Sequence, residues 1–327
     1  MKKPVIATVA VSAVLVAGVG VVYVTGTYDG WRDGRQLKSA CGGLVDAAET
    51  QRALGVHRVS GKRLGDGCRA FDPDSDKGSL EVSVHRGREL DELPLDEIRD
   101  PALQLLPVRG GWPAVVSAGG GAKAYATGSV PCGKSADDAV VVSLRAVRSS
   151  TGTDADRRGA LARLMTRALK NAAGKQGCAL PDTKDVKDVA PGFDGMKAPG
   201  EATGTCRGTG LRSYEAVADS GAPIEQCVPA EPDGGREFKI TAYYGPYAKA
   251  PRHDPHRSPY DYVGASGNRG GKAWTTASCP AGEALYTIEP LTPSSPSTDL
   301  ERHILQGFAA DSAQRHGCGK PIGADKP

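Results

Sequence analysis

The sequence predicts an α+β protein in which an N-terminal transmembrane helix is followed by two related, disulfide-stapled α+β domains with antiparallel sheets. Three observations carry this prediction. A long apolar run lies near the N-terminus, eight cysteines fall into two sets of four, and strand and helix patterns recur in the same order around both sets. The cysteines are Cys41, Cys68, Cys132, Cys178, Cys206, Cys227, Cys279 and Cys318.

The membrane anchor is predicted from residues 5–24, which are apolar without interruption and follow two lysines and a proline. At the rise of an α-helix such a run spans about 30 Å, the thickness of the hydrocarbon core. The alternative is a cleaved signal peptide, but the apolar part of a signal peptide is usually only about 7–15 residues long. We therefore expect residues 1–28 to be a retained anchor, with the membrane as the partner of residues 5–24.

The orientation of the anchor is predicted from the cysteines, because basic residues flank the apolar run on both sides. Disulfides persist outside the cytosol, so we expect a single-pass protein of the cell membrane with a cytoplasmic N-terminus and an extracytoplasmic bulk. In each set, pairing of the first cysteine with the second and of the third with the fourth is favoured. Metal ligation is the alternative, but no two cysteines form a Cys-x-x-Cys pair, and no metal site is assigned.

The duplication is clearest in the strands. Apolar and polar residues alternate at 80–85 and at 238–243, which predicts half-buried strands. Both halves also carry a Lys-Ala-aromatic triplet before the third cysteine and an apolar run after it. These segments are residues 123–125 and 272–274, and residues 140–144 and 284–288.

Each half then ends in a predicted helix, with apolar positions at helical spacing over 161–172 and over 300–309. Both helices have an N-cap signal before them, and a glycine precedes the fourth cysteine of each set as a stop signal. A shorter helix is expected over residues 44–54, with Gly55 as its end. The corresponding segment after Cys206 has only a weak pattern.

These patterns set the expected domain boundaries. The anchor is followed by a polar stalk, the first α+β repeat, a linker rich in proline and glycine, the second repeat and a tail. The ranges are 1–28 for the anchor, 29–40 for the stalk, 41–181 for the first repeat, 182–205 for the linker, 206–321 for the second repeat and 322–327 for the tail.

Composition excludes some classes of function. The 41 basic and 38 acidic residues leave a net charge of +3, so nothing indicates a nucleic-acid partner. Aromatic residues make up only 5 % of the chain, and we expect cores of valine, leucine and alanine. No cofactor is expected.

Two motifs match the sequence pattern of known sites but lack a feature that those sites need. Residues 128–135 fit the phosphate-binding pattern G-x-x-x-x-G-K-[ST], but a β-type run follows where that chemistry needs a helix, so a turn between strands is the preferred interpretation. Asp72, Asp74 and Asp76 resemble a calcium loop. The twelfth position is Ser83 instead of the bidentate glutamate, so a solvated turn is expected.

The densest group of functional side chains lies between two prolines and after them, and provides weak ligand-binding candidates. These are His253, His256, Tyr260 and Asp261. The prolines exclude a regular helix there, so a long exposed loop is expected. His303 and His316 fall on the last predicted helix and are expected at the surface. Neither G-x-S-x-G nor H-E-x-x-H occurs in the chain, and no catalytic residue is assigned.

The layout resembles the uncharacterised membrane-anchored extracytoplasmic proteins common in high-G+C Gram-positive (actinobacterial) bacteria. The resemblance rests on the short basic start, the single apolar run and the cysteine-paired exterior rich in Ala, Gly, Val, Arg and Asp. It carries over no site residues. We expect a non-catalytic cell-surface protein that binds a ligand or organises the envelope, with a cell-envelope or protein partner. The alternative is an exported enzyme of hydrolase type with a loop-borne site in one repeat.

Overall fold

The computed structural model describes most of the chain from residue 27 to residue 323. The residues left out are 1–26, 76–77, 87–88, 90–92, 94–102, 118–121, 134–137, 149–153, 187–188, 190–192, 194, 234, 236–237, 253–261, 292–297 and 324–327. The predicted anchor run therefore lies outside the described residues. Among the helices that are described, none has the length and apolar character needed to cross a membrane.

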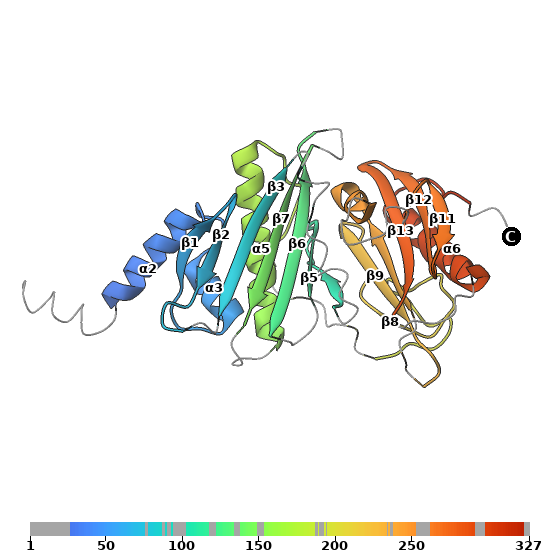
Figure 1. The fold of residues 1–327 in the computed structure, drawn as a ribbon, viewed down its shortest axis with the longest axis horizontal. Helices are drawn as coiled ribbons and strands as arrows, with labels where there is room; N and C mark the ends of the chain where they lie inside the picture. Colours follow the sequence, from blue (N-terminus) through green and yellow to red (C-terminus); the bar gives the residue numbers. More distant parts are fainter. Residues whose placement is uncertain are drawn as a thin grey trace, which may run out of the picture.

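In its described residues, the first unit is a seven-stranded antiparallel sheet with the helices α2, α3 and α5 (Figure 1). Its strands, in the order β1-β2-β3-β7-β6-β5-β4, are β1 (Ser60–Leu64), β2 (Gly67–Phe71), β3 (Ser79–Arg86), β7 (Ala139–Val147), β6 (Lys123–Pro131), β5 (Ala114–Ser117) and β4 (Leu105–Pro107). Helix α5 (Asp154–Gln176) packs across β5, β6 and β7, and α3 (Ala47–Leu54) packs beside it. Helix α2 (Thr27–Ala40) packs against β1.

The second unit is a six-stranded antiparallel sheet with one long helix. Its strands, in the order β11-β12-β13-β10-β9-β8, are β11 (Ser266–Arg269), β12 (Lys272–Cys279), β13 (Gly282–Pro290), β10 (Phe238–Tyr243), β9 (Ile224–Pro229) and β8 (Ser213–Glu215). Helix α6 (Thr298–Arg315) covers β10, β12 and β13. Two short 3₁₀ helices, η2 (Gly245–Ala248) and η3 (Ala250–Arg252), follow β10.

The two sheets share one strand order. The order β1-β2-β3-β7-β6-β5 of the first unit corresponds strand by strand to β8-β9-β10-β13-β12-β11 of the second, and β4 is an addition at one edge. The closing helices α5 and α6 occupy the same place in both. The predicted α+β class with two antiparallel sheets is confirmed, and the shared order is the one that a duplicated unit would have.

Each unit contains two disulfides, and the four bonds have the pairing that was expected. Cys41–Cys68 joins the turn after α2 to β2, and Cys132–Cys178 joins the end of β6 to the end of α5. The other two bonds, Cys206–Cys227 and Cys279–Cys318, do the same in the second unit. Such bonds indicate an oxidising compartment outside the cytoplasm.

The helix ends follow local sequence. Asp46 caps α3 by accepting a hydrogen bond from the backbone N–H of Glu49 at 2.9 Å, and Gly55 ends the helix in the left-handed conformation with φ of 70°. Gly177 and Gly317, directly before the fourth cysteines, have φ of 71° and 66°. The predicted stop signals are confirmed. No helix forms after Cys206, where the pattern was weak.

Residues 29–40, for which the sequence predicts a polar stalk, form most of α2 and pack on the first unit. The carboxylate of Asp33 is buried and accepts hydrogen bonds from Arg58 Nη2 at 2.6 Å and Nε at 3.0 Å. Leu37, one turn later, is also buried. A side chain at Gly61 of β1 would come within 2.8 Å of the Leu37 Cα, so the glycine permits this close approach.

The predicted linker also lies against both units. Trp112 Nε1 donates to the Lys184 carbonyl at 2.7 Å, and Phe193 is buried in the core of the first unit. Further along, Lys197 pairs with Ser213 at the start of β8. The segment is thus packed along much of its described length.

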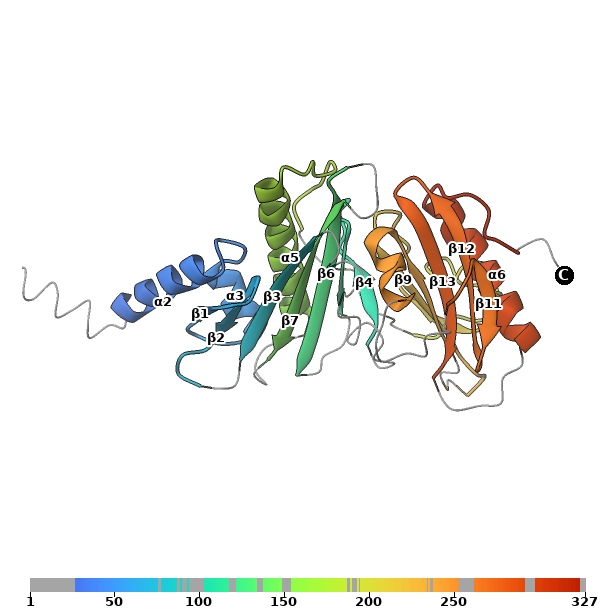
Figure 2. The ribbon, with the colours of Figure 1, turned by 45° about the horizontal axis from the view of Figure 1, so that its top comes forward.

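The inner faces of the two sheets meet, while α5 and α6 lie on the other faces (Figures 1 and 2). An apolar cluster between them joins side chains of β5, β6 and β7 to side chains of β10, η2, β12 and β13. Its larger members are Val115, Tyr125, Val141, Tyr243, Tyr247, Trp274 and Leu285. Hydrogen bonds also join the two units across this interface. Tyr247 Oη and Thr127 Oγ1 lie 2.5 Å apart, and the Leu105 N–H donates to Gln226 Oε1 at 2.9 Å.

This interface overturns one expectation. The strand at 238–243 was expected to be half-buried, yet all six residues of β10 are buried, Lys239 and Thr241 included. The reason is that the first unit covers the polar face of β10, and Lys239 Nζ donates to the Leu103 carbonyl at 3.2 Å. The corresponding strand β3 lies outside the group of strands β5, β6 and β7 that meets the second unit. Its polar face stays partly exposed, as predicted.

Replacing Tyr247 by phenylalanine is expected to lower the free energy of unfolding by about 1 kcal/mol, the net contribution of one buried hydrogen bond. Chemical denaturation of the single variant, of Thr127→Val and of the pair forms a double-mutant cycle. The two substitutions should be non-additive because they remove the same bond between the units. Strictly additive effects would contradict the contact.

Candidate functional site

The candidate site is a cleft of about 710 Å³ between the two units. It lies where the end of β6 comes next to the turn between β12 and β13 (Figures 1 and 2). These are corresponding hairpins of the two units, each carrying the third cysteine of its set. Pro131 and Gly133 line the cleft from the first unit, and Pro280 and Ala281 line it from the second.

The walls of the cleft are built mostly from small residues. Most of the described lining is proline, glycine and alanine, and the hydroxyls come from Ser129 and Ser220. Among the described residues that line it there is no Lys, Arg, Asp or Glu. Such a lining suits a ligand without net charge.

One wall of the cleft carries two stacked rings. The Tyr244 ring, directly after β10, and the His316 ring, directly after α6, have centroids 3.7 Å apart and planes 15° apart. The His316 side chain is only 7 % exposed. The expectation of a surface position is confirmed for His303 but wrong for His316, because the last turn of α6 directs this side chain toward the sheet.

A buried polar network supports the two rings from behind. Glu225 of β9 has a side chain only 1 % exposed. Arg315 donates to both of its carboxylate oxygens, at 3.2 Å from Nε and 3.1 Å from Nη2. Ser312 donates to Glu225 Oε2 and shares a hydrogen bond with the Tyr244 hydroxyl. His316 Nε2 lies 3.4 Å from Glu225 Oε1. The bidentate pair of Arg315 and Glu225 therefore holds the Tyr244 ring through Ser312 and lies beside the His316 ring.

The protonation states follow from these contacts. Burial alone would raise the pKa of Glu225, but the hydrogen bond and charge of His316 and the charge of Arg315 outweigh it, so the pKa lies below 4.5, its ordinary value. Burial raises the pKa of Tyr286 to about 12. It also raises the pKa of Tyr244 far above its ordinary range. At neutral pH the network thus contains the ionised Glu225 carboxylate, paired with the Arg315 guanidinium, beside neutral phenols.

Acidification is expected to weaken the fold through Glu225. Since its folded pKa is depressed, its contribution to stability is complete above 4.5 and is lost as the pH falls through the folded pKa. Thermal unfolding from neutral to acidic pH should show a steeper fall of Tm in the native protein than in Glu225→Gln. A difference in Tm that stays constant with pH would contradict this assignment.

The network does not have the geometry of a nucleophilic triad. Ser312 is fully buried and donates to Glu225, not to His316. A catalytic serine would need to face substrate and to donate to the base. These residues are therefore a support for the wall of the cleft. The signal that could have drawn attention to them is the Arg-His pair that directly follows the apolar stripe of α6.

The four ligand-binding candidates predicted from the sequence, His253, His256, Tyr260 and Asp261, lie outside the described residues. Both ends of their segment are described. On one side, Arg252 pairs with Glu283 at 2.9 Å. On the other, the Tyr262 ring packs edge-on against Trp274 at 5.6 Å within the cluster between the units. Both described ends of this segment thus lie in the second unit.

The phosphate-like pattern and the calcium-like run both lie only partly within the described residues, and residues 134 and 135 of the first are outside them. Residues 128–131 belong to β6, and β7 begins at Ala139, so the phosphate-like pattern bridges two strands. Asp72 accepts from the Asp74 N–H at 3.0 Å, and Asp74 pairs with Arg58 at 2.8 Å, while Asp76 is outside the described residues. In the described parts of the chain no three His, Cys, Asp or Glu side chains gather as metal ligands.

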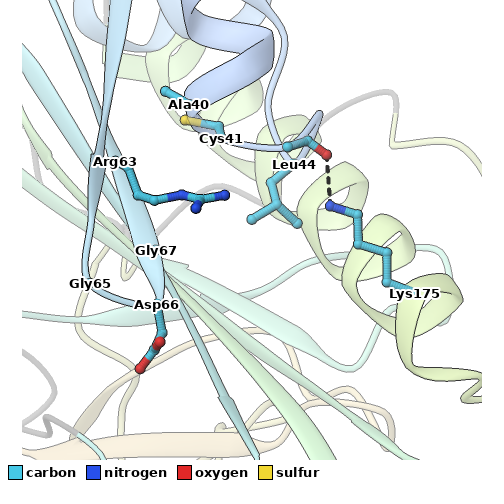
Figure 3. A pocket seen from close by; sticks show the side chains of 9 residues that line it. Ala40, Cys41, Leu44, Arg63, Gly65, Asp66, Gly67 and Lys175 are labelled. Atoms are coloured by element: carbon cyan, nitrogen blue, oxygen red, sulfur yellow. Dashed lines mark hydrogen bonds between the residues drawn. The ribbon is translucent and has the colours of Figure 1, made fainter.

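A smaller pocket of about 310 Å³ lies in the first unit between the turn after α2, the β1–β2 hairpin and the end of α5 (Figure 3). Arg63 and Lys175 approach it from opposite sides. Lys175 Nζ donates to the Gly42 carbonyl at 2.7 Å, so this cation already joins the helix to the turn. We interpret the pocket as a joint between these elements.

Comparison of the chain with protein-family models, with curated proteins and with solved structures found no match. The site is therefore argued from its geometry alone.

Proposed function

We propose that the protein is a non-catalytic cell-surface binding protein whose ligand site is the cleft between the two units. The observation that carries the proposal is the cleft itself. It is formed by corresponding hairpins of both units, has a described lining without Lys, Arg, Asp or Glu, and is backed by the hydrogen-bonded network around Glu225. Its volume of about 710 Å³ lies within the range of about 300–1,000 Å³ that is usual for small-molecule sites.

The ligand class follows from the lining. A flat ring or sugar face would lie on the stacked rings of Tyr244 and His316, and an apolar body would contact the prolines. The absence of Lys, Arg, Asp and Glu from the described lining disfavours a strongly ionic ligand, because few groups described there would replace its water. We propose an uncharged, partly apolar molecule, such as a component of the cell envelope.

The proposed location is the outer face of a membrane, with residues 5–24 as a single-pass anchor and the N-terminus in the cytoplasm. The uninterrupted apolar sequence of that run and the four disulfides support it. Helix α2, which follows the run, lies at one end of the elongated molecule and the second unit lies at the other (Figure 1). The cleft would then stand away from the bilayer.

Binding of Nile red, an uncharged aromatic dye, tests the cleft. The native protein should bind it with a blue-shifted emission, and Ala281→Trp should weaken binding at least about tenfold by filling the cleft, a loss of about 1.4 kcal/mol. Ala281 is exposed on its turn, so the larger ring should leave the fold intact.

The matched control is Val217→Trp, at a position 48 % exposed that does not line the cleft. It should leave the affinity for the dye unchanged. Equal affinity in both tryptophan variants would place the dye elsewhere and would contradict the proposed site.

A further inference from the structure

Helix α2 presents an outward face whose chemistry matches that of a membrane surface. We propose that this face, formed by Trp31, Arg32, Arg35 and Lys38, contacts the anionic headgroups of the bilayer. Helix α2 would then be a fixed strut between the bilayer and the first unit. The inference rests on the proposed anchor at residues 5–24.

The inward side of α2 is fixed to the fold. Asp33 pairs with Arg58 of the first unit at 2.6 Å, Leu37 is buried against β1, and Gln36 accepts a hydrogen bond from Ser60 at 3.0 Å. These contacts span more than one turn, so they define both the position and the rotation of the helix. The outward residues are therefore held in a set direction.

The outward side combines an aromatic ring with cations. The Trp31 side chain is 54 % exposed, and the Arg35 guanidinium lies 3.8 Å from the centroid of its ring. Arg32 and Lys38 are exposed beside them. The acidic neighbour on this side, Asp29, pairs with Arg32 at 3.2 Å. Tryptophan with a guanidinium at its face is suited to the interfacial layer of a bilayer, where the ring meets lipid and the cation meets phosphate.

The distance along the chain places this face at headgroup level. The apolar run ends at residue 24, and α2 begins at Thr27. Four residues of helix raise Trp31 by about 6 Å above Thr27. The headgroup layer on each side of the hydrocarbon is about 5–7 Å thick. At the same rise Arg35 and Lys38 stand about 12 and 17 Å above Thr27, outside the headgroup layer, and helical side chains point back toward the helix N-terminus, so these cations attract anionic lipids from just beyond that layer.

We expect lipid and not a protein partner at this face, because the proposed anchor at residues 5–24 would bring the bilayer next to α2. A second protein would have to share the space beside Trp31 with the bilayer that residues 5–24 enter. The three cations against one paired carboxylate select the anionic fraction of that bilayer.

Tryptophan fluorescence in the full chain, reconstituted in vesicles, tests the contact. The chain has three tryptophans, and Trp112 and Trp274 are only 7 % and 6 % exposed, so the difference from Trp31→Phe isolates the Trp31 signal. A nitroxide label on the phosphatidylcholine headgroup should quench most of this signal. An equal mixture of phosphatidylcholine and phosphatidylglycerol should increase the quenching over phosphatidylcholine alone. The triple variant Arg32→Gln, Arg35→Gln, Lys38→Gln should lose that increase.

The matched control moves the reporter to the far end of the molecule. Leu300→Trp in the Trp31→Phe background places an exposed ring on α6, and it should not be quenched. Equal quenching at positions 31 and 300, or no response to phosphatidylglycerol, in a chain that resists alkaline extraction from the vesicles would overturn the inference and leave the anchor intact. Loss of the chain on alkaline extraction would overturn both.

Discussion

Replacing Glu225 by glutamine is expected to lower the free energy of unfolding by about 3 kcal/mol, at the low end for breaking a buried ion pair. The carboxylate is almost fully enclosed and accepts hydrogen bonds from Arg315 and Ser312. Without its charge, the Arg315 guanidinium, whose side chain is 12 % exposed, keeps Asp311 as its one other ionic partner among the described residues. Urea unfolding at neutral pH, followed by circular dichroism, measures the change.

The matched control is Asp299→Asn, which also neutralises one carboxylate paired with an arginine. Asp299 is 94 % exposed and lies 3.7 Å from Arg302, so its loss should change the stability by no more than about 0.5 kcal/mol. An effect of Glu225→Gln as small as that of the control would show that the network does not support the fold.

Removal of the disulfide Cys132–Cys178 by a double serine substitution is expected to lower the free energy of unfolding by about 4 kcal/mol in the chain-entropy account. The bond closes a loop with a sequence separation of 46, and it joins the end of β6 to the end of α5. Its loss frees the end of the helix that covers the first sheet. Denaturant titration under non-reducing conditions measures the change in the remaining three-disulfide protein.

The corresponding serine pair at Cys206 and Cys227 closes a shorter loop, with a separation of 21, and should cost somewhat less, about 3 kcal/mol. Both variants should keep their other disulfides intact. A Cys132–Cys178 variant as stable as the native protein would contradict the cross-linking role assigned to this bond.

The sequence predicted what depends on local pattern. The apolar run at 140–144 and the alternation at 80–85 predicted β7 and β3, because side chains alternate across a pleated strand. Cysteine order predicted the pairing, since corresponding cysteines occupy corresponding elements in both units. Glycine stop signals placed the ends of α3, α5 and α6 because left-handed backbone favours glycine.

The sequence did not predict what depends on contact between distant segments. Lys239 and Thr241 are polar, as on a solvent-facing strand, and only the first unit buries them. Gly30 and Gly34 disfavour a helix, so the local sequence does not predict α2. The tertiary contacts of Asp33 and Leu37 stabilise it. The cleft is formed by turns of proline, glycine and alanine that carry no chemical motif.

The bonds between the inner faces of the sheets decide how the cleft can work. Tyr247, Gln226 and Lys239 fasten one unit to the other within the buried interface. Jaw-like capture, in which two lobes swing together around a molecule, would have to break these bonds at every cycle. Any ligand of the cleft therefore meets a preformed opening, and its rate of capture is governed by diffusion and fit at the entrance.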